Sequence, residues 1–241
     1  YPREVFGIMI KVFTMKKYIS LLAISLGIFS CAPKKQNIIA IDVLLIPSEE
    51  MYAQSLQLNS LINQNNPETI KLDENHVPHI TLLQCFINDE DLPKLNGALE
   101  GLFNTIKNDS LKAESLFYYS EKEESFSMIA IEKNEQLLQL HQKVIELVKP
   151  FIVKNGSEKS FVQNPDGSPI SESTLSYVPE FVDKHSFENF DPHISLGVAQ
   201  TTLLDSLALQ VFKPIQFKVE SLSVYQLGDH GTAQKLLWES K

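Results

Sequence analysis

A repeated pentapeptide carries the residues of this sequence that could do chemistry. The sequence PHITL, which begins at position 78, recurs 114 positions later as PHISL. Alternate residues of a β-strand point to the same face, so His79 and Thr81 would project together, as would His193 and Ser195. Each copy therefore offers one imidazole and one hydroxyl side by side. If the two copies face each other across a cleft, two imidazoles and two hydroxyls converge on one small volume.

Such a set of groups suits the cleavage of a phosphodiester. The reaction needs a base that activates the nucleophile and an acid that protonates the leaving oxygen, and histidine fills either role because its pKa lies at about 6.5. The two hydroxyls would donate hydrogen bonds to the non-bridging phosphate oxygens. This chemistry predicts a site without a metal or any other cofactor. The residues themselves do not order the two histidines as acid and base.

A metal site is the alternative that the acidic residues near the repeat raise. His76 precedes the first copy and follows Asp73 and Glu74, and Asp191 precedes the second copy. Transition-metal sites use His and carboxylates, but these acids lie in polar segments and lack a metal-ligand spacing. A solvated loop is therefore the favoured interpretation, and no metal ligand is predicted.

Other polar residues are weighed against structural roles. His141 lies on the apolar stripe of a predicted helix and is expected in the core, while His230 follows Gly-Asp and is expected in a turn. His185 either belongs to a loop or reaches the cleft. Asp42 interrupts an apolar strand, so it either supports a site residue from a buried position or faces solvent at a sheet edge. Cys85 is predicted to be a buried small hydrophobe.

The duplicated motif resembles the 2H phosphoesterase superfamily, which is named for two His-x-Thr/Ser motifs on related halves. Members include 2′,3′-cyclic nucleotide phosphodiesterases and bacterial 2′-5′ RNA ligase-like proteins, and the segment KHSFENFD before the second motif resembles the latter branch. The resemblance covers residues 37–241. It implies a bilobal α/β (α+β) fold, with two pseudo-symmetric lobes of antiparallel sheet and helices around a central cleft.

The resemblance also implies roles for the four repeated residues. His79 and His193 become the catalytic acid/base pair, and Thr81 and Ser195 become substrate-binding ligands of the phosphate oxygens. By resemblance to the cyclic phosphodiesterases, His193 would be the base for water and His79 the acid on the leaving oxygen.

The pattern of apolar residues predicts alternating strands and helices beyond position 37. Residues 155–173 are rich in Gly, Pro, Ser and Asn and are predicted to form a loop of the length that is typical of a lid or an insertion. Strands are predicted over 38–46, 80–86, 111–119, 126–132, 193–198, 212–227 and 236–238, and helices over 47–65, 89–108, 135–149 and 174–184.

The first thirty-six residues contain a predicted targeting signal. A basic start at Met15, about a dozen apolar residues and the sequence IFSC resemble a bacterial lipoprotein signal peptide over 15–30, with lipidation at Cys31. Residues 1–14 are interpreted as upstream translation and 31–36 as a tether. A plain signal peptide or an anchor helix is the alternative, although a bilayer span needs about 20 apolar residues.

The charge of the chain limits its partners. It carries 30 acidic against 21 basic residues, and its only Arg is Arg3. Long nucleic acids are bound by several Lys or Arg side chains, so the expected partner is a small phosphorylated substrate, either a cyclic nucleotide or a short oligonucleotide. The apolar fraction of 43% is enough for a packed core and excludes a disordered chain.

The sequence as a whole predicts a metal-independent phosphoesterase that opens 2′,3′-cyclic phosphates, held as a lipoprotein by its N-terminal lipid anchor at the membrane, outside the cytoplasm. Two alternatives stay open. One is a non-catalytic nucleotide- or phosphate-binding lipoprotein, and the other is 2′-5′ RNA ligase-like processing of RNA ends. The residues leave open the natural substrate, the ester bond that is cleaved and the membrane face.

Overall fold

Strand β1 (Ile38–Pro47) lies at the centre of a five-stranded sheet in the computed structural model, which describes residues 37–241. Nearly every side chain of β1 is buried, as its continuous apolar run predicts.

The predicted signal peptide, Cys31 and the tether over 31–36 lie outside the described residues. Within the described part, no helix has the length and apolar character of a membrane span.

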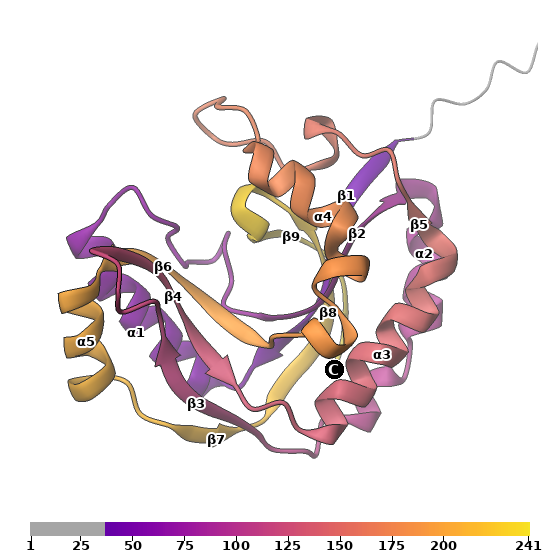
Figure 1. Ribbon diagram of the computed structural model, residues 1–241. Coiled ribbons are helices and arrows are strands. Elements are labelled where there is room, and N and C mark those ends of the chain that lie inside the picture. Colours follow the sequence, from indigo (N-terminus) through magenta and orange to yellow (C-terminus); the bar gives the residue numbers. More distant parts are fainter. Residues whose placement is uncertain (1–36) are drawn as a thin grey trace, which may run out of the picture. The chain divides into compact units, whose positions relative to one another are not determined.

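Two antiparallel sheets form the frame of the described chain (Figure 1). The first has the order β5-β2-β1-β8-β9 and the second the order β6-β4-β3-β7. The first sheet takes strands from both ends of the described chain, so the two lobes are not consecutive halves of the sequence. The remaining strands are β2 (Ile80–Asn88), β3 (Leu111–Phe117), β4 (Glu124–Ile131), β5 (Ile152–Val153), β6 (His193–Gln200), β7 (Ile215–Phe217), β8 (Val219–Leu227) and β9 (Ala233–Ser240).

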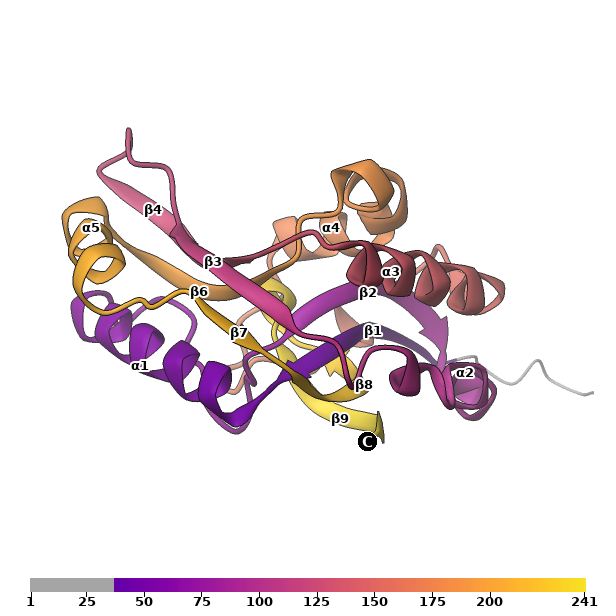
Figure 2. The ribbon, with the colours of Figure 1, turned by 90° about the horizontal axis from the view of Figure 1, so that it is seen from below.

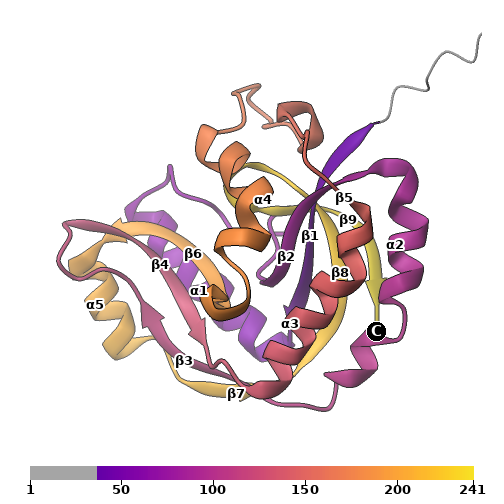
Figure 3. The same cartoon turned by 45° about the vertical axis from the view of Figure 1, so that its right-hand side comes forward.

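The helices cover the two sheets separately (Figure 2). Helices α1 (Glu49–Asn65) and α5 (Thr201–Gln210) pack against the four-stranded sheet, where both contact β6. Helices α2 (Leu92–Leu99) and α3 (Glu135–Val148) pack together beside the five-stranded sheet, where α3 contacts β2. Helix α4 (Glu172–Lys184) packs against β2, as Figures 1 and 3 show. The predicted α+β class and the two antiparallel sheets are thereby confirmed.

Two predictions about the helices are wrong in detail. The helix expected over 89–108 is interrupted, because Gly101 adopts a φ of +77° and separates α2 from a short 3₁₀ turn. The apolar side chains Leu95, Leu99 and Phe103 of this segment are nevertheless all buried. Helix α5 was not predicted. Its sequence TTLLDSLALQ does not separate apolar from polar residues clearly onto two faces, and only Leu204 and Leu207 of the helix are buried.

The two motif strands share an irregularity at the same place. In β2 the pairing with β1 shifts after Thr81, so that Leu82 is an extra residue without a partner across the ladder. In β6 the pairing with β4 shifts after Ser195, so that Leu196 is the extra residue. A β-bulge bends its strand and changes the faces to which the following side chains point. The sequence repeat is thus also a structural repeat.

The loop over 155–173 does not form the expected lid. Phe161 and Ile170 are buried in a small apolar cluster with Phe86 of β2, so the loop is packed against the five-stranded sheet. Only Ser173 of this segment lines the cleft described below. The wall of the cleft is instead α4, which follows the loop.

Candidate active site

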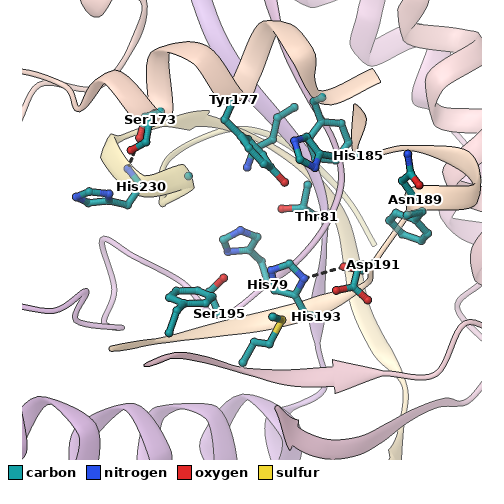
Figure 4. Close-up of a pocket in the computed structure, with 17 residues that line it drawn as sticks. His79, Thr81, Ser173, Tyr177, His185, Asn189, Asp191, His193, Ser195 and His230 are labelled. Carbon is teal, nitrogen blue, oxygen red and sulfur yellow. Dashed lines mark hydrogen bonds between the residues drawn. The ribbon is translucent and has the colours of Figure 1, made fainter. Parts of the chain in front are cut away.

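A cleft of about 600 Å³ brings the four predicted site residues together. His79 and Thr81 reach it from the start of β2, and His193 and Ser195 reach it from β6 at the edge of the other sheet. Figure 4 shows the rings of the two histidines next to each other. Strands β2 and β6 belong to different sheets, so the site exists only because the two sheets meet there.

The two imidazoles are held by the same local hydrogen bond. Nδ1 of His79 lies 2.7 Å from the carbonyl oxygen of Val77, and Nδ1 of His193 lies 2.7 Å from the carbonyl oxygen of Asp191. A carbonyl oxygen only accepts, so Nδ1 carries the hydrogen in both rings. In each neutral ring Nε2 is therefore free to accept a proton in the cleft, and it can give that proton back once the ring is the imidazolium.

The two histidines differ in their surroundings. The side chain of His79 is only 13% exposed, and burial lowers its pKa to about 4, helped by the nearby charge of His193 and opposed by the bond to Val77. Loss of hydration disfavours the charged imidazolium, so His79 is neutral near pH 7. A neutral imidazole with an open Nε2 is suited to accept a proton.

The two hydroxyls differ as well. Thr81 Oγ1 donates a hydrogen bond of 2.7 Å to Oδ2 of the buried Asp42, whose Oδ2 also lies 3.6 Å from Nε2 of His79. Of the two positions considered for Asp42, the structure shows the buried one beside the site. Within residues 37–241, the Ser195 hydroxyl has no hydrogen-bond partner, so it is free to bind a ligand in the cleft.

Helix α4 supplies an aromatic wall that sequence reasoning missed. The rings of Tyr177 and His185 are stacked, with centroids 4.2 Å apart, and both line the cleft above the two motif histidines (Figure 4). Burial raises the pKa of Tyr177 to about 12, so its phenol stays protonated. His185 therefore reaches the cleft, which was one of its two expected positions. The apolar face of α4 gave no signal that Tyr177 would border a site.

A carboxylate fixes the start of α4 beside the cleft. The N-cap residue Ser171 donates to Asp229 from its hydroxyl at 2.6 Å, and the Thr174 hydroxyl donates to the same carboxylate at 2.7 Å. Burial acts to raise the pKa of Asp229, but these hydrogen bonds hold it at about 2. Asp229 begins the turn that contains His230, as predicted, and His230 also lines the cleft.

His141 is a core residue, as expected, and it supports the segment before the second motif. Its Nδ1 donates to the carbonyl oxygen of Leu82, and its Nε2 accepts from the backbone N–H of Phe187. Its ring also stacks on Phe190 at 3.8 Å. Both ring nitrogens are used, so His141 stays neutral, and burial lowers its pKa. Cys85 is likewise buried, as predicted, and burial raises the pKa of its thiol.

The side chains in the cleft that could bind an anion by charge are imidazoles. His79, His185, His193 and His230 all line it, whereas none of the described residues that line it is Lys or Arg. An anion in the cleft would thus be bound by histidines and hydroxyls. Over residues 37–241, no group of three His, Cys, Asp or Glu side chains is placed to hold a metal ion. His76 instead donates from Nδ1 to the carbonyl oxygen of Lys71 and contacts Gln234.

Two solved structures and one family model are similar to this chain. Among solved structures, TT0787 of Thermus thermophilus is 16% identical with a TM-score of 0.46, covering 83% of this chain and 96% of its own. Usb1 of Kluyveromyces marxianus is 13% identical with a TM-score of 0.39, covering 84% and 97%. No curated protein matches the sequence. A family model described as the 2′-5′ RNA ligase superfamily matches residues 47–231, so the chain belongs to that superfamily, a branch of the 2H phosphoesterases.

Proposed function

We propose that this cleft opens 2′,3′-cyclic phosphates of nucleotides or short oligonucleotides, with His79 and His193 as the acid/base pair. Membership of the superfamily supports a phosphoesterase or RNA-processing role. The observation that carries the finer proposal is the paired geometry of the histidines. Both rings keep the hydrogen on Nδ1 and turn Nε2 toward one cleft, where two hydroxyls are also present.

The reaction assigns one step to each group. Nε2 of His79 takes a proton from water as the water oxygen attacks phosphorus. His193 enters the step as the imidazolium, with a hydrogen on both ring nitrogens, and its Nε2 gives a proton to the leaving ribose oxygen. One P–O bond forms, one breaks, and the product is a phosphomonoester. Ser195 and Thr81 donate to the non-bridging oxygens. This order is the reverse of the one that the resemblance implies. Burial lowers the pKa of His79, so His79 enters the step without a proton on Nε2 and is assigned the role of base.

The size and charge of the cleft favour a small substrate. A volume of about 600 Å³ is typical of a small-molecule site. A track of Lys or Arg, which RNA binding would need, is missing among the lining residues. A cyclic mononucleotide or a short oligonucleotide end therefore fits better than a long RNA, and the ligase-like alternative loses support.

We also propose that the protein is exported and tethered by a lipid on Cys31. The support comes from the sequence, namely the basic start, the short apolar run and the sequence IFSC. Metabolic labelling with a radioactive fatty acid tests this, and Cys31→Ser should abolish incorporation. Incorporation that persists in Cys31→Ser would contradict the proposal.

The activity is tested with the full chain in detergent and EDTA. The four 2′,3′-cyclic nucleotides are the substrates, and the 2′- and 3′-phosphate products are separated. We expect His79→Ala and His193→Ala each to lose about a hundredfold or more in turnover, the scale of general acid/base catalysis. His76→Ala, a histidine outside the cleft, is the matched control and should keep its activity. Nucleotide binding without any turnover by the wild type would instead support the binding-protein alternative.

A further inference from the structure

The Thr81 hydroxyl, the first of the two, is hydrogen-bonded to a buried carboxyl group. Asp42 is fully buried on β1, and its Oδ2 accepts from Thr81 Oγ1 at 2.7 Å and from Gln84 Nε2 at 3.0 Å. Its other oxygen, Oδ1, has no hydrogen-bond partner within residues 37–241, and neither has the buried Oε1 of Gln84. Two buried acceptor atoms of the residues bonded to Thr81 or to its carboxyl partner thus lack a hydrogen-bond donor.

The repeat of the fold does not require a carboxyl group at this position. Thr81 lies opposite Leu44 on β1, and Ser195 lies opposite Met128 on β4. Asp42 precedes Leu44 by two residues, and the residue that precedes Met128 by two is Phe126. The second hydroxyl therefore has a phenyl ring where the first has a carboxyl group. This asymmetry indicates a function that belongs to the first motif alone.

The β2 bulge completes the cluster around Asp42. Without the extra residue Leu82, a side chain three positions after Thr81 would point to the opposite face of the strand. The bulge returns Gln84 to the face of Thr81, and both side chains then reach the same carboxyl oxygen. The cluster is therefore built into the irregular register of β2.

The charge state of Asp42 decides what the Thr81 hydroxyl can do. An ionised carboxylate holds a hydroxyl by a charge-assisted hydrogen bond and repels an anion close to it. A neutral carboxyl group holds the hydroxyl weakly and exerts no such repulsion. Protonation at Oδ1 would also turn this unpartnered acceptor into a donor, and an unsatisfied buried acceptor costs about 1–3 kcal/mol. Burial favours this neutral form and raises the pKa of Asp42 to about 8.

Among residues 37–241, no Lys or Arg forms an ion pair with Asp42 that would keep it ionised. His79, just before β2, lies 3.6 Å from it, and Cys85 of β2 and Tyr177 of α4 are close enough for its charge to raise their pKa values. Tyr225 is its cross-strand partner on β8. All four groups are neutral when Asp42 is protonated near pH 7, so the neutral cluster is self-consistent.

We propose that Asp42 is a positioning residue, which lets Thr81 bind the phosphoryl group only while its own carboxyl group is protonated. Protonated Asp42 releases the Thr81 hydroxyl toward an anion in the cleft. Ionised Asp42 retains that hydroxyl and places a negative charge 3.6 Å from Nε2 of His79. The inference rests on the proposed role of Thr81 as a phosphate ligand. It makes anion binding sensitive to pH through a group that is not one of the two histidines.

The binding of inorganic sulfate to the full chain in detergent tests this inference. Sulfate keeps its charge from about pH 6 to 9.5, so any change in its affinity, measured by calorimetry, reports on the protein. Between pH 7 and 9 we expect the wild type to lose about tenfold more affinity than Asp42→Asn, which stays neutral, and this scale corresponds to one hydrogen bond to a charged group. The histidines of the cleft are the same in both proteins, so the difference between the two affinity curves isolates the effect of the Asp42 charge, including its effect on the nearby His79.

Two matched variants separate the hydroxyls. Ser195→Ala should bind sulfate more weakly at every pH but keep the loss near pH 8, because Ser195 has no carboxyl group behind it. Thr81→Val should remove that loss, since the hydroxyl that Asp42 controls is gone. If Asp42→Asn and the wild type lose affinity in parallel, the inference is wrong while the phosphate site stands. If the wild type does not bind sulfate at all, the proposed phosphate site and the inference fail together.

A second measurement does not depend on any variant folding. The ¹³Cγ resonance of Asp42 in the labelled wild type, assigned through the sequence, reports its ionisation directly. We expect a midpoint near pH 8. A midpoint near pH 4, the ordinary value of an aspartate, would overturn the inference.

Discussion

The side chain of Thr69 occupies the space that a Cβ atom on Gly197 would need. A Cβ built on Gly197 lies 2.6 Å from Thr69 Oγ1, and Gly197 has a φ of +113°, which side-chain-bearing residues rarely adopt. Thr69 is not free to move away, because its Oγ1 accepts a 2.7 Å hydrogen bond from the backbone N–H of Val198. This close contact fixes β6 immediately after the bulge that follows Ser195.

Gly197→Ala should therefore damage both stability and activity. We expect a loss of about 1–3 kcal/mol in the free energy of unfolding, measured by denaturant titration, because of the strained backbone. Turnover should fall by more than the smaller fraction of folded protein accounts for, because the bulge orients Ser195. Gly97→Ala on α2 is the matched control: nothing lies within 4 Å of its Cβ, so it should be neutral or slightly stabilising. Equal effects of the two substitutions would contradict the argument.

The order of acid and base can be tested with an activated leaving group. A p-nitrophenyl phosphodiester of a nucleoside needs little protonation of its leaving oxygen, so general acid catalysis contributes less to its cleavage. His193→Ala should then lose less than about tenfold, whereas His79→Ala should keep its loss of about a hundredfold or more. The ratio of kcat values on the activated and natural esters is the measurement. If the activated ester instead reduces the loss of His79→Ala and not that of His193→Ala, then His79 is the acid and His193 the base, as the family resemblance implies.

Tyr177 should bind the nucleobase. Its ring borders the cleft above the two histidines and is backed by the stacked ring of His185. Stacking of a base on an aromatic side chain is worth about 1–3 kcal/mol, so Tyr177→Ala should raise the KM for a 2′,3′-cyclic nucleotide by about tenfold or more. Glycerol 1,2-cyclic phosphate has no base and is the control substrate. A similar rise in KM for both substrates would contradict a stacking role.

His141 should make the stability of the protein depend on pH. Because burial lowers its pKa in the folded state, the unfolded chain binds the proton more readily below about pH 6.5. The stabilisation by neutral His141 is therefore fully present above that pH and is lost as the pH falls. His141→Phe should cost about 2–4 kcal/mol at about pH 7.5, because the Phe187 N–H and the Leu82 carbonyl lose their partners.

The pH dependence of this variant supplies the decisive comparison. The difference in unfolding free energy between wild type and His141→Phe should shrink as the pH is lowered from 7 to 5. His79, whose pKa is also lowered, titrates in both proteins and does not affect the difference. A difference that stays constant over this range would show that His141 does not titrate as described.

Much of the fold follows from local patterns in the sequence. The strands that contain His79 and His193, the hairpin of β3 and β4 and the amphipathic helix α3 are all formed close to their predicted bounds. Each depends on residues near one another in the chain, so the periodicity of apolar side chains is sufficient to predict it. The pairing of each histidine with a hydroxyl follows in the same way, because it needs only the alternation of a strand.

Tertiary structure decided the features that separate the two motifs. The sequence left open whether Asp42 is buried or at a sheet edge, and only the order of strands in the five-stranded sheet buries it beside Thr81. Gln84 joins it because a bulge interrupts the alternation on which sequence analysis relies. Tyr177 reaches the cleft because α4 packs on β2. Residues far apart in the chain share a site only after the sheets meet, and no local pattern contains that information.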